Sequence, residues 1–151
     1  MKKIIGLVGT NSDFSTNRQL LQFMEKHFQD KIDMELVEIN NLPLFNKPAD
    51  RKIPEEAQEI ADKIVDADGV IISTPEYDQS ITAALSSALS WLSYGIYPFV
   101  DKPVMITGAS YGTLGSSRRP IIFCRVALST ALPAISPTEY LAAIPSSLAG
   151  S

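Results

Sequence analysis

The sequence predicts an α/β sandwich in which a parallel sheet is covered by helices on both faces. Three observations lead to this prediction: continuous apolar runs, amphipathic helical segments between them, and turn residues at the end of each run. Continuous apolar runs are typical of strands buried on both faces, and strands that alternate with helices favour right-handed crossovers. The 151 residues suit a single domain, 1–151, that is large enough to bury a core.

Four apolar runs are expected to be strands. They are IIGLVG at 4–9, MELVEI at 34–39, GVIIST at 69–74 and PVMITG at 103–108. MELVEI alternates more than the others, which suits a strand nearer the edge of the sheet. Beyond them, we expect a short helix over 123–130 and a further strand near 132–135.

Helical segments lie between these strands. Apolar residues at helical spacing predict three helices, with the stripes Leu20, Leu21, Met24 and Phe28; Ala57, Ile60, Ala61, Ile64 and Val65; and Ile81, Ala84, Leu85, Ala88, Leu89 and Leu92. Pro54 suits the first turn of the second helix, where Glu55 and Glu56 complement the helix dipole. Asp68 and Gly69 are expected to close that helix.

Composition excludes several classes of protein. A net charge of -4 argues against a nucleic-acid binder, which normally has a basic face. Cys124 is the only cysteine, so no internal disulfide is expected and a reduced, cytoplasmic setting is favoured. We see no signal-type segment and no apolar run of about 20 residues that would span a membrane. His27 is the only histidine, so neither a metal cluster nor a catalytic triad is expected.

Three loops are expected at the carboxyl edge of the sheet, where ligands bind in parallel α/β folds: 9–17, 74–80 and 108–117. The first, GTNSDFSTN, leads into a helix whose N-terminus favours an anion. Thr10, Ser12, Ser15 and Asn17 could add neutral donors around a phosphate, or Ser15 or Thr16 could simply cap the helix. The loop lacks the glycine and lysine pattern of a nucleoside-triphosphate loop and the G-x-G-x-x-G pattern of a dinucleotide site.

The second loop, TPEYDQS, offers backbone groups and an aromatic ring to a flat ligand. Pro75 stiffens the turn, and Glu76, Tyr77 and Asp78 follow it. The alternative is an ordinary strand-to-helix turn in which Ser80 caps the helix. The third loop, GASYGTLGSS, has three glycines, which permit close backbone approach to a ligand but also serve plain turns.

Together these three loops resemble the NADPH-dependent FMN reductase family, whose flavodoxin-like members include azoreductase-like and chromate-reductase-like quinone reductases. The first loop resembles the family form G-S-x-R-x-x-S-x-N-x-x-L, with Ser12 in place of its arginine. LPLFN resembles the L-P-x-F-N turn, PEYDQSITAALSSALSW resembles P-E-Y-N-x-S-x-P-G-x-L-K-N-A-x-D-W, and GASYGTLGSSR resembles G-A-S-x-G-x-x-G-x-x-R. The resemblance covers 1–118.

The resemblance implies a flavodoxin-like three-layer sandwich with a parallel five-stranded sheet in the order 2-1-3-4-5. It implies that FMN is held by residues of the three loops: Thr10, Ser12, Ser15, Thr16, Asn17, Pro75, Glu76, Tyr77, Asp78, Ser80, Ser110, Tyr111, Gly112 and Gly115. NADPH or NADH would pass hydride through the flavin to a quinone, azo compound, metal oxyanion or free flavin by a ping-pong mechanism. No side chain would be catalytic, and the protein would be a homodimer or homotetramer.

Two departures keep other readings open. Ser12 removes a charge-assisted phosphate contact, for which Arg18 could partly compensate. After Arg118 the family pattern ends, and the last 33 positions hold only three charged residues, Arg119, Arg125 and Glu139. The alternatives are an FMN-binding electron carrier that does not turn over nicotinamide, and a non-catalytic α/β domain with an altered C-terminus.

Overall fold

β1 (Lys2–Val8) lies inside a parallel sheet, with β2 (Ile32–Glu38) on one side and β3 (Gly69–Ser73) on the other. β4 (Val104–Thr107) pairs with β3, so the order is β2-β1-β3-β4 in the computed structural model, which describes residues 1–109. The predicted order 2-1-3-4 and the edge position of the second strand are confirmed. The predicted fifth strand, the helix over 123–130 and the atypical tail 119–151 lie outside the described residues.

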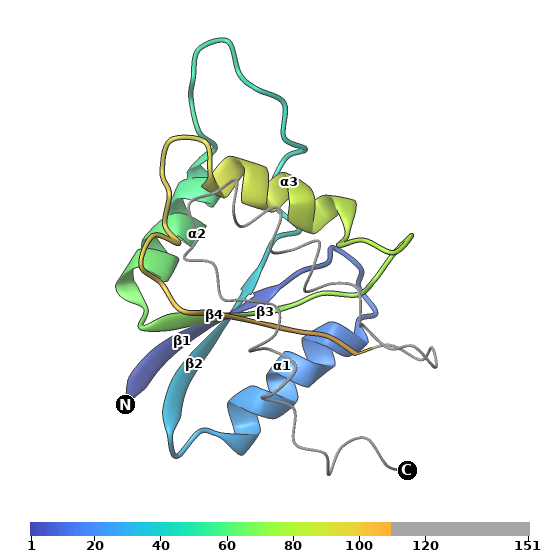
Figure 1. Cartoon of the computed structure of the whole chain (residues 1–151), viewed down its shortest axis with the longest axis vertical. Coiled ribbons are helices and arrows are strands. Elements are labelled where there is room, and N and C mark those ends of the chain that lie inside the picture. Colours follow the sequence, from blue (N-terminus) through green and yellow to red (C-terminus); the bar gives the residue numbers. More distant parts are fainter. Residues whose placement is uncertain (110–151) are drawn as a thin grey trace.

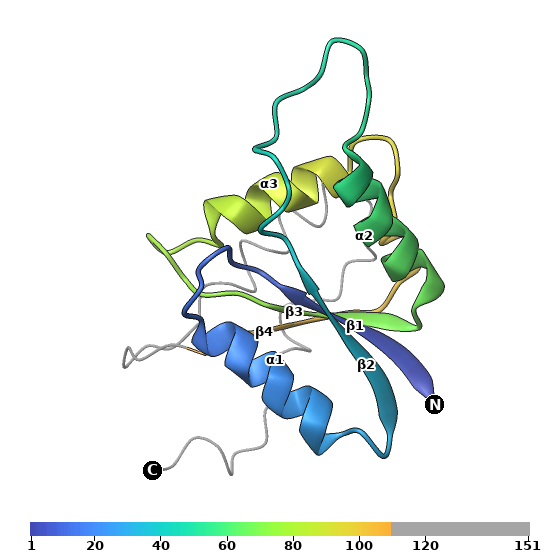
Figure 2. The same ribbon diagram turned by 180° about the vertical axis from the view of Figure 1, so that it is seen from behind.

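Helices cover both faces of this sheet, as Figures 1 and 2 show from opposite sides. α1 (Thr16–His27) lies on one face, and α2 (Glu55–Asp66) and α3 (Ala83–Leu92) lie on the other. The three-layer sandwich expected from the alternation of strands and helices is therefore confirmed.

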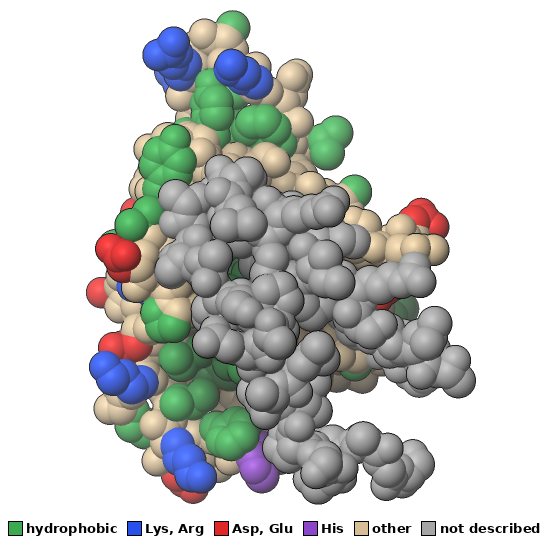
Figure 3. Space-filling view, in the orientation of Figure 1, with side chains coloured by type: hydrophobic (Ala, Val, Ile, Leu, Met, Phe, Trp, Pro, Cys, Tyr) green, Lys and Arg blue, Asp and Glu red, His purple; other side chains and the backbone are tan. Residues whose placement is uncertain are grey.

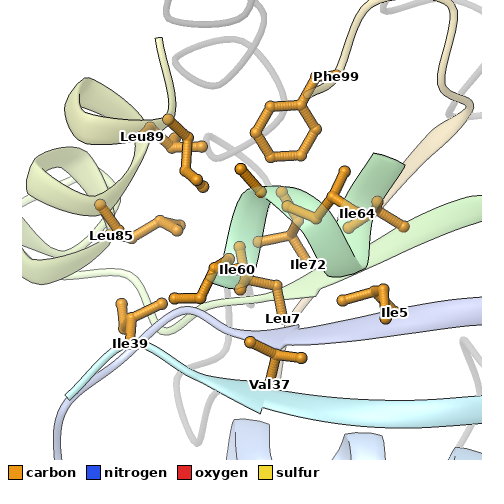
Figure 4. Close-up of a cluster of buried hydrophobic side chains, with 14 of the residues drawn as sticks. Ile5, Leu7, Val37, Ile39, Ile60, Ile64, Ile72, Leu85, Leu89 and Phe99 are labelled. Atoms are coloured by element: carbon orange, nitrogen blue, oxygen red, sulfur yellow. The ribbon is translucent and has the colours of Figure 1, made fainter. Parts of the chain in front are cut away.

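The period of two along β1 divides the core between the two faces. Ile5 and Leu7 are fully buried in the larger cluster beneath α2 and α3, which Figure 4 shows with Ile60, Ile64, Leu85 and Phe99 among its members. Val8 points to the opposite face and packs with Leu21 of α1 and Met34 of β2. The apolar runs of the sequence are thus continuous because both faces of β1 are covered.

The helix ends differ from expectation in detail. Ser15 caps α1 by accepting a hydrogen bond from the N–H of Arg18 (3.2 Å), which decides between the two cap candidates, Ser15 and Thr16. Pro54 is the residue before α2, and Glu55 and Glu56 occupy its first turn. The alternative in which Ser80 caps α3 is wrong, because Thr82 accepts from the N–H of Leu85 (3.0 Å) and fills the cap position.

A long loop between β2 and α2 projects from the body of the protein (Figure 1). Its first part is tied to α3, because the N–H of Phe45 donates to Ser87 Oγ (2.7 Å) and Trp91 Nε1 donates to the carbonyl of Pro43 (2.8 Å). The Phe45 ring also packs edge-on against Trp91, with centroids 4.8 Å apart. Trp91 and Phe99 are buried, as expected for core residues. Basic side chains gather over the tip of the loop (Figure 3).

Candidate functional site

The first two loops are joined at the carbonyl of Gly9. Thr74 Oγ1 and Thr82 Oγ1 both donate to that oxygen, at 3.1 and 2.8 Å, and the N–H of Gly9 donates to the carbonyl of Ser73 at 2.7 Å. A Cβ on Gly9 would lie 2.7 Å from Thr74 Cβ, so the backbones approach as closely as they do because the residue is glycine. The loop after β1 and the segment before α3 therefore meet at one edge of the sheet.

Asn17 joins this edge to the start of the third loop. Its side chain is buried, and Oδ1 accepts from Ser73 Oγ (3.1 Å) and from the N–H of Ala109 (2.9 Å). Nδ2 donates to the carbonyl of Ala109 (3.2 Å). Asn17 was expected to touch a phosphate, and that contact stays a prediction. The bonds that the structure gives it hold the ends of three elements together.

The polar side chains of the first loop largely hold the loop's own shape. Thr10 is buried, and its Oγ1 accepts from the N–H of Ser12 (3.2 Å). Ser12 Oγ donates to the carbonyl of Phe14 (3.0 Å), and Ser15 caps the helix that Thr16 begins. These side chains shape a turn that leads its backbone onto the N-terminus of α1.

Arg18 does not take the place of the family's arginine. Its Nε and Nη2 bond both carboxylate oxygens of Glu38, at 2.6 and 2.9 Å. Its Nη1 donates to the carbonyls of Ser12 (2.8 Å) and Asp13 (3.2 Å). The hydrogen bonds with Glu38 raise the pKa of the guanidinium above its already high ordinary value. Direct compensation for Ser12 by Arg18 is therefore not supported, because four of the five N–H groups of the guanidinium are engaged behind the loop.

The second loop is a tight turn. Tyr77 and Ser80 exchange backbone hydrogen bonds of 3.1 and 2.9 Å, and Asp78 and Gln79 between them have φ values of 49° and 62°. Positive φ at both central residues is the pattern of a type I′ turn. Tyr77 is 55% exposed at this turn, so its ring is available to a ligand.

The remaining predicted site residues differ in how far the structure describes them. Pro75 and Glu76 are half-buried between β3 and the turn, and Asp78 is exposed at its tip. Gly108 and Ala109 begin the third loop. Ser110, Tyr111, Gly112 and Gly115 lie outside the described residues.

The N-terminus of α1 has the chemistry that suits a phosphate. No acidic residue lies in its first turn, whereas α2 begins with Glu55 and Glu56. A helix N-terminus carries partial positive charge, which the acidic side chains of the first turn complement in α2 and which an anion could complement in α1. Asp13 is the one acidic residue of the loop, and its charge acts on Arg18. The site thus fits a phosphate through neutral donors.

Sequence reasoning missed Glu38, Ser73, Thr74 and Thr82, which all support these loops. Thr82 carried a usable signal, since a threonine at the start of an apolar helical stripe is a cap candidate. Glu38 carried none, because its partner Arg18 is twenty residues away and on another element.

Comparison with known proteins agrees with this geometry. The family model described as NADPH-dependent FMN reductase matches residues 2–145. The chain belongs to the NADPH-dependent FMN reductase family. By its description, this family binds FMN as its flavin and takes electrons from a reduced nicotinamide. Among relatives, NADH:(hydroxy)cinnamate reductase subunit CrdA of Vibrio ruber is 56% identical over 114 residues, which is 76% of this chain and 56% of that protein.

Two further comparisons place this family member among flavin enzymes. NADH-dependent flavin reductase subunit 2 of Lactobacillus johnsonii is 46% identical over 120 residues, covering 77% of this chain and 64% of that protein. FerB, a flavoenzyme NAD(P)H:(acceptor) oxidoreductase from Paracoccus denitrificans, superposes with a TM-score of 0.80 at 25% identity, covering 91% of this chain and 76% of that one. The chain thus spans less than two thirds of the length of both curated relatives.

Membrane-spanning helices and metal-binding clusters are both absent from residues 1–109. Among residues 1–109, no helix combines the length and apolar character needed to cross a membrane. Within the same range, no three or more His, Cys, Asp or Glu side chains are grouped so that they could hold a metal ion.

Proposed function

We propose that the protein is an FMN-dependent NAD(P)H oxidoreductase that reduces quinones, azo compounds, metal oxyanions or free flavin. The observation that carries the proposal is the meeting of two loops at the carboxyl edge of the sheet in a member of the FMN reductase family. One loop presents the N-terminus of α1, which suits the phosphate of FMN. The other presents Tyr77 on a tight turn, which suits the flat ring.

In this proposal the side chains bind and orient rather than react. The backbone N–H groups before α1 hold the phosphate, and Thr10, Ser12, Ser15, Thr16 and Asn17 shape that loop. Bound FMN supplies the redox chemistry, taking a hydride from NADH or NADPH and returning the two electrons, with protons, to the acceptor. Pro75, Glu76, Tyr77, Asp78 and Ser80 border its ring, together with Ser110, Tyr111, Gly112 and Gly115 from the third loop.

The test begins with cofactor binding. FMN titrated into the apo-protein should lose fluorescence as it binds, and anaerobic NADH or NADPH should then bleach the visible flavin band. Initial rates with a quinone should give parallel double-reciprocal lines, as expected when nicotinamide and acceptor use the same site in turn. A protein that binds FMN without bleaching is an electron carrier, and one that binds no FMN is a non-catalytic domain; either result overturns the proposal.

A second candidate function follows from the names of two relatives. CrdA is a subunit of an NADH:(hydroxy)cinnamate reductase, and the Lactobacillus johnsonii protein is subunit 2 of a flavin reductase. The chain could therefore pass electrons to a second protein subunit instead of a small acceptor. Slow turnover with every small acceptor, despite rapid bleaching by NADH, would favour this candidate.

The proposal also includes assembly as a homodimer or homotetramer. Large apolar side chains remain exposed in the loop that follows α3, with Tyr97 at 52% and Val100 at 47% exposure next to the buried Phe99. Burying such side chains between subunits would remove them from water. Light scattering coupled to size exclusion gives the mass of the particle, and a monomer at working concentration would contradict this part. The cytoplasmic location expected from the single cysteine stays a prediction.

A further inference from the structure

Arg18 and Glu38 form a bidentate ion pair behind the first loop. Arg18 lies in the first turn of α1 and Glu38 is the last residue of β2. Their side chains are only 18% and 34% exposed, and two hydrogen bonds of 2.6 and 2.9 Å join them. Paired bonds of this kind fix the plane of the guanidinium as well as its position. Glu38 therefore determines where the third nitrogen of Arg18 points.

That third nitrogen bonds the backbone of the loop. Nη1 donates to the carbonyls of Ser12 and Asp13, at 2.8 and 3.2 Å. In a trans peptide the carbonyl of one residue and the N–H of the next point in opposite directions. Since the described chain has no cis peptide bond, the N–H groups of Asp13 and Phe14 face away from Arg18.

Those N–H groups are left available within the described part of the chain. No hydrogen bond among residues 1–109 uses the N–H of Asp13 or Phe14 as donor, whereas the N–H of Ser12 and of Arg18 are both bound by side chains of the loop. The peptide dipoles of the loop are thus oriented with their negative ends on a cation and their positive ends away from it. This is the orientation that an anion needs.

We propose that Arg18 and Glu38 are positioning residues for the binding of the FMN phosphate. Glu38 orients the guanidinium, and the guanidinium holds two carbonyls so that the following N–H groups are presented to the phosphate. The inference rests on the proposed function, since it concerns how that same site holds its cofactor. It explains how a loop with Ser12 in place of an arginine can still bind a dianion, since the binding energy comes from an ordered backbone rather than from a charged contact.

The direction in which Glu38→Gln changes the FMN affinity distinguishes a positioning role from a simple effect of charge. Glu38→Gln removes a negative charge near the phosphate, so Coulomb attraction alone predicts tighter FMN binding. A positioning role predicts weaker binding, because the neutral amide no longer accepts both hydrogen bonds that orient the Arg18 guanidinium. Arg18→Met weakens binding under both explanations. Weaker FMN binding in both variants therefore indicates positioning. Weaker binding in Arg18→Met with tighter binding in Glu38→Gln indicates an effect of charge.

The experiment measures the dissociation constants of FMN and riboflavin by fluorescence quenching. Riboflavin lacks the phosphate, so its affinity reports on the ring site alone. We expect Glu38→Gln and Arg18→Met each to weaken FMN binding by about tenfold and to change riboflavin binding less than about twofold. The matched control is Glu35→Gln, which removes the carboxylate that pairs with Lys63 at 2.8 Å on the same strand. It should leave both affinities unchanged.

The possible outcomes can be told apart. Unchanged or tighter FMN binding by Glu38→Gln overturns the positioning role, and an equal loss for FMN and riboflavin overturns it as well, since that is general loosening of the fold. If Arg18→Met does not fold, Arg18→Lys is measured in its place. One ammonium group cannot make both the paired hydrogen bonds to Glu38 and the contacts to the two carbonyls. Wild-type protein that binds neither flavin overturns the proposed function itself, before any variant is compared.

Discussion

Asn17 and Ala109 lie 92 positions apart in the sequence and exchange two hydrogen bonds. Asn17 Nδ2 donates to the carbonyl of Ala109 at 3.2 Å, and the N–H of Ala109 donates to Asn17 Oδ1 at 2.9 Å. The same oxygen accepts from Ser73 Oγ at 3.1 Å. One buried amide thus connects the start of α1 with the ends of β3 and β4, and the site depends on that connection.

We expect Asn17→Leu to destabilise the fold by about 2–4 kcal/mol, because it removes the hydrogen-bond partner of the buried Ser73 hydroxyl and of both backbone groups of the half-buried Ala109. Urea unfolding followed by circular dichroism measures this free energy. Asn11→Leu is the control, since Asn11 is exposed in the same loop. Equal unfolding midpoints for the two variants would show that the Asn17 amide does not contribute to the stability of the fold in this way.

Gly9→Ala tests the close approach of the first two loops. The new Cβ would lie 2.7 Å from Thr74 Cβ and 2.9 Å from the carbonyl oxygen of Ser73, and neither atom can move without shifting the backbone. We expect a loss of about 1–3 kcal/mol in the free energy of unfolding, as for other overpacked sites.

Gly6→Ala is the matched control for this steric argument. Its Cβ would meet the terminal methyl of Met34 at 2.6 Å, and the end of that flexible side chain can turn away. The alanine also restricts the unfolded chain, so the net change should stay below about 1 kcal/mol. A greater loss for Gly6→Ala than for Gly9→Ala, read from thermal melting curves, would contradict the argument.

Periodicity was enough to predict the strands and helices, but not the contacts that build the site. Continuous apolar runs gave the strands of a doubly covered sheet, and the stripe from Leu85 to Leu92 gave α3. The cap considered for α3, Ser80, lies two residues before the true cap, Thr82, because the two hydroxyls have the same chemistry. Only the tight turn, which binds the backbone of Ser80 to Tyr77, distinguishes them.

The supporting network could not be predicted because it depends on which strands are neighbours. Arg18 meets Glu38 because β2 lies beside β1 and ends close to the start of α1. Asn17 meets Ala109 because β4 is placed beside β3. Neither pair leaves a local pattern in the sequence. By contrast, the loops themselves were predictable, since their small polar residues follow the buried strands directly.

Asp68 should make the fold sensitive to acid. The hydrogen bond from Lys2 Nζ (2.7 Å), and after it the N–H of Lys3 (2.8 Å), lowers the pKa of this carboxyl below its ordinary value of 3.8. A lowered folded-state pKa stabilises the fold above the unfolded-state value, and this contribution is lost as the pH falls through the folded-state value.

We therefore expect Asp68→Asn to be less stable than wild type at neutral pH, and the difference to be smaller at about pH 2, because protonation of the wild-type carboxyl at acid pH removes the same interaction. Urea midpoints at the two pH values give the comparison. Asp30→Asn, which removes a carboxylate with no ion pair within residues 1–109, serves as control. A gap between Asp68→Asn and wild type that is the same at both pH values would rule out the titration of Asp68 as its origin.

Ser87→Ala should loosen the projecting loop without unfolding the protein. Ser87 Oγ accepts from the N–H of Phe45 at 2.7 Å, and the loop continues to the exposed Arg51 and Lys52, where trypsin cuts. Losing one hydrogen bond of about 1 kcal/mol raises the open population about fivefold, and cleavage rises with it when opening is fast. Mass spectrometry of timed digests measures the rate, and Ser86→Ala is the control, since Ser86 is exposed on the same helix. Equal cleavage rates for the two variants would mean that the aromatic packing of Phe45 on Trp91, rather than this hydrogen bond, holds the loop to α3.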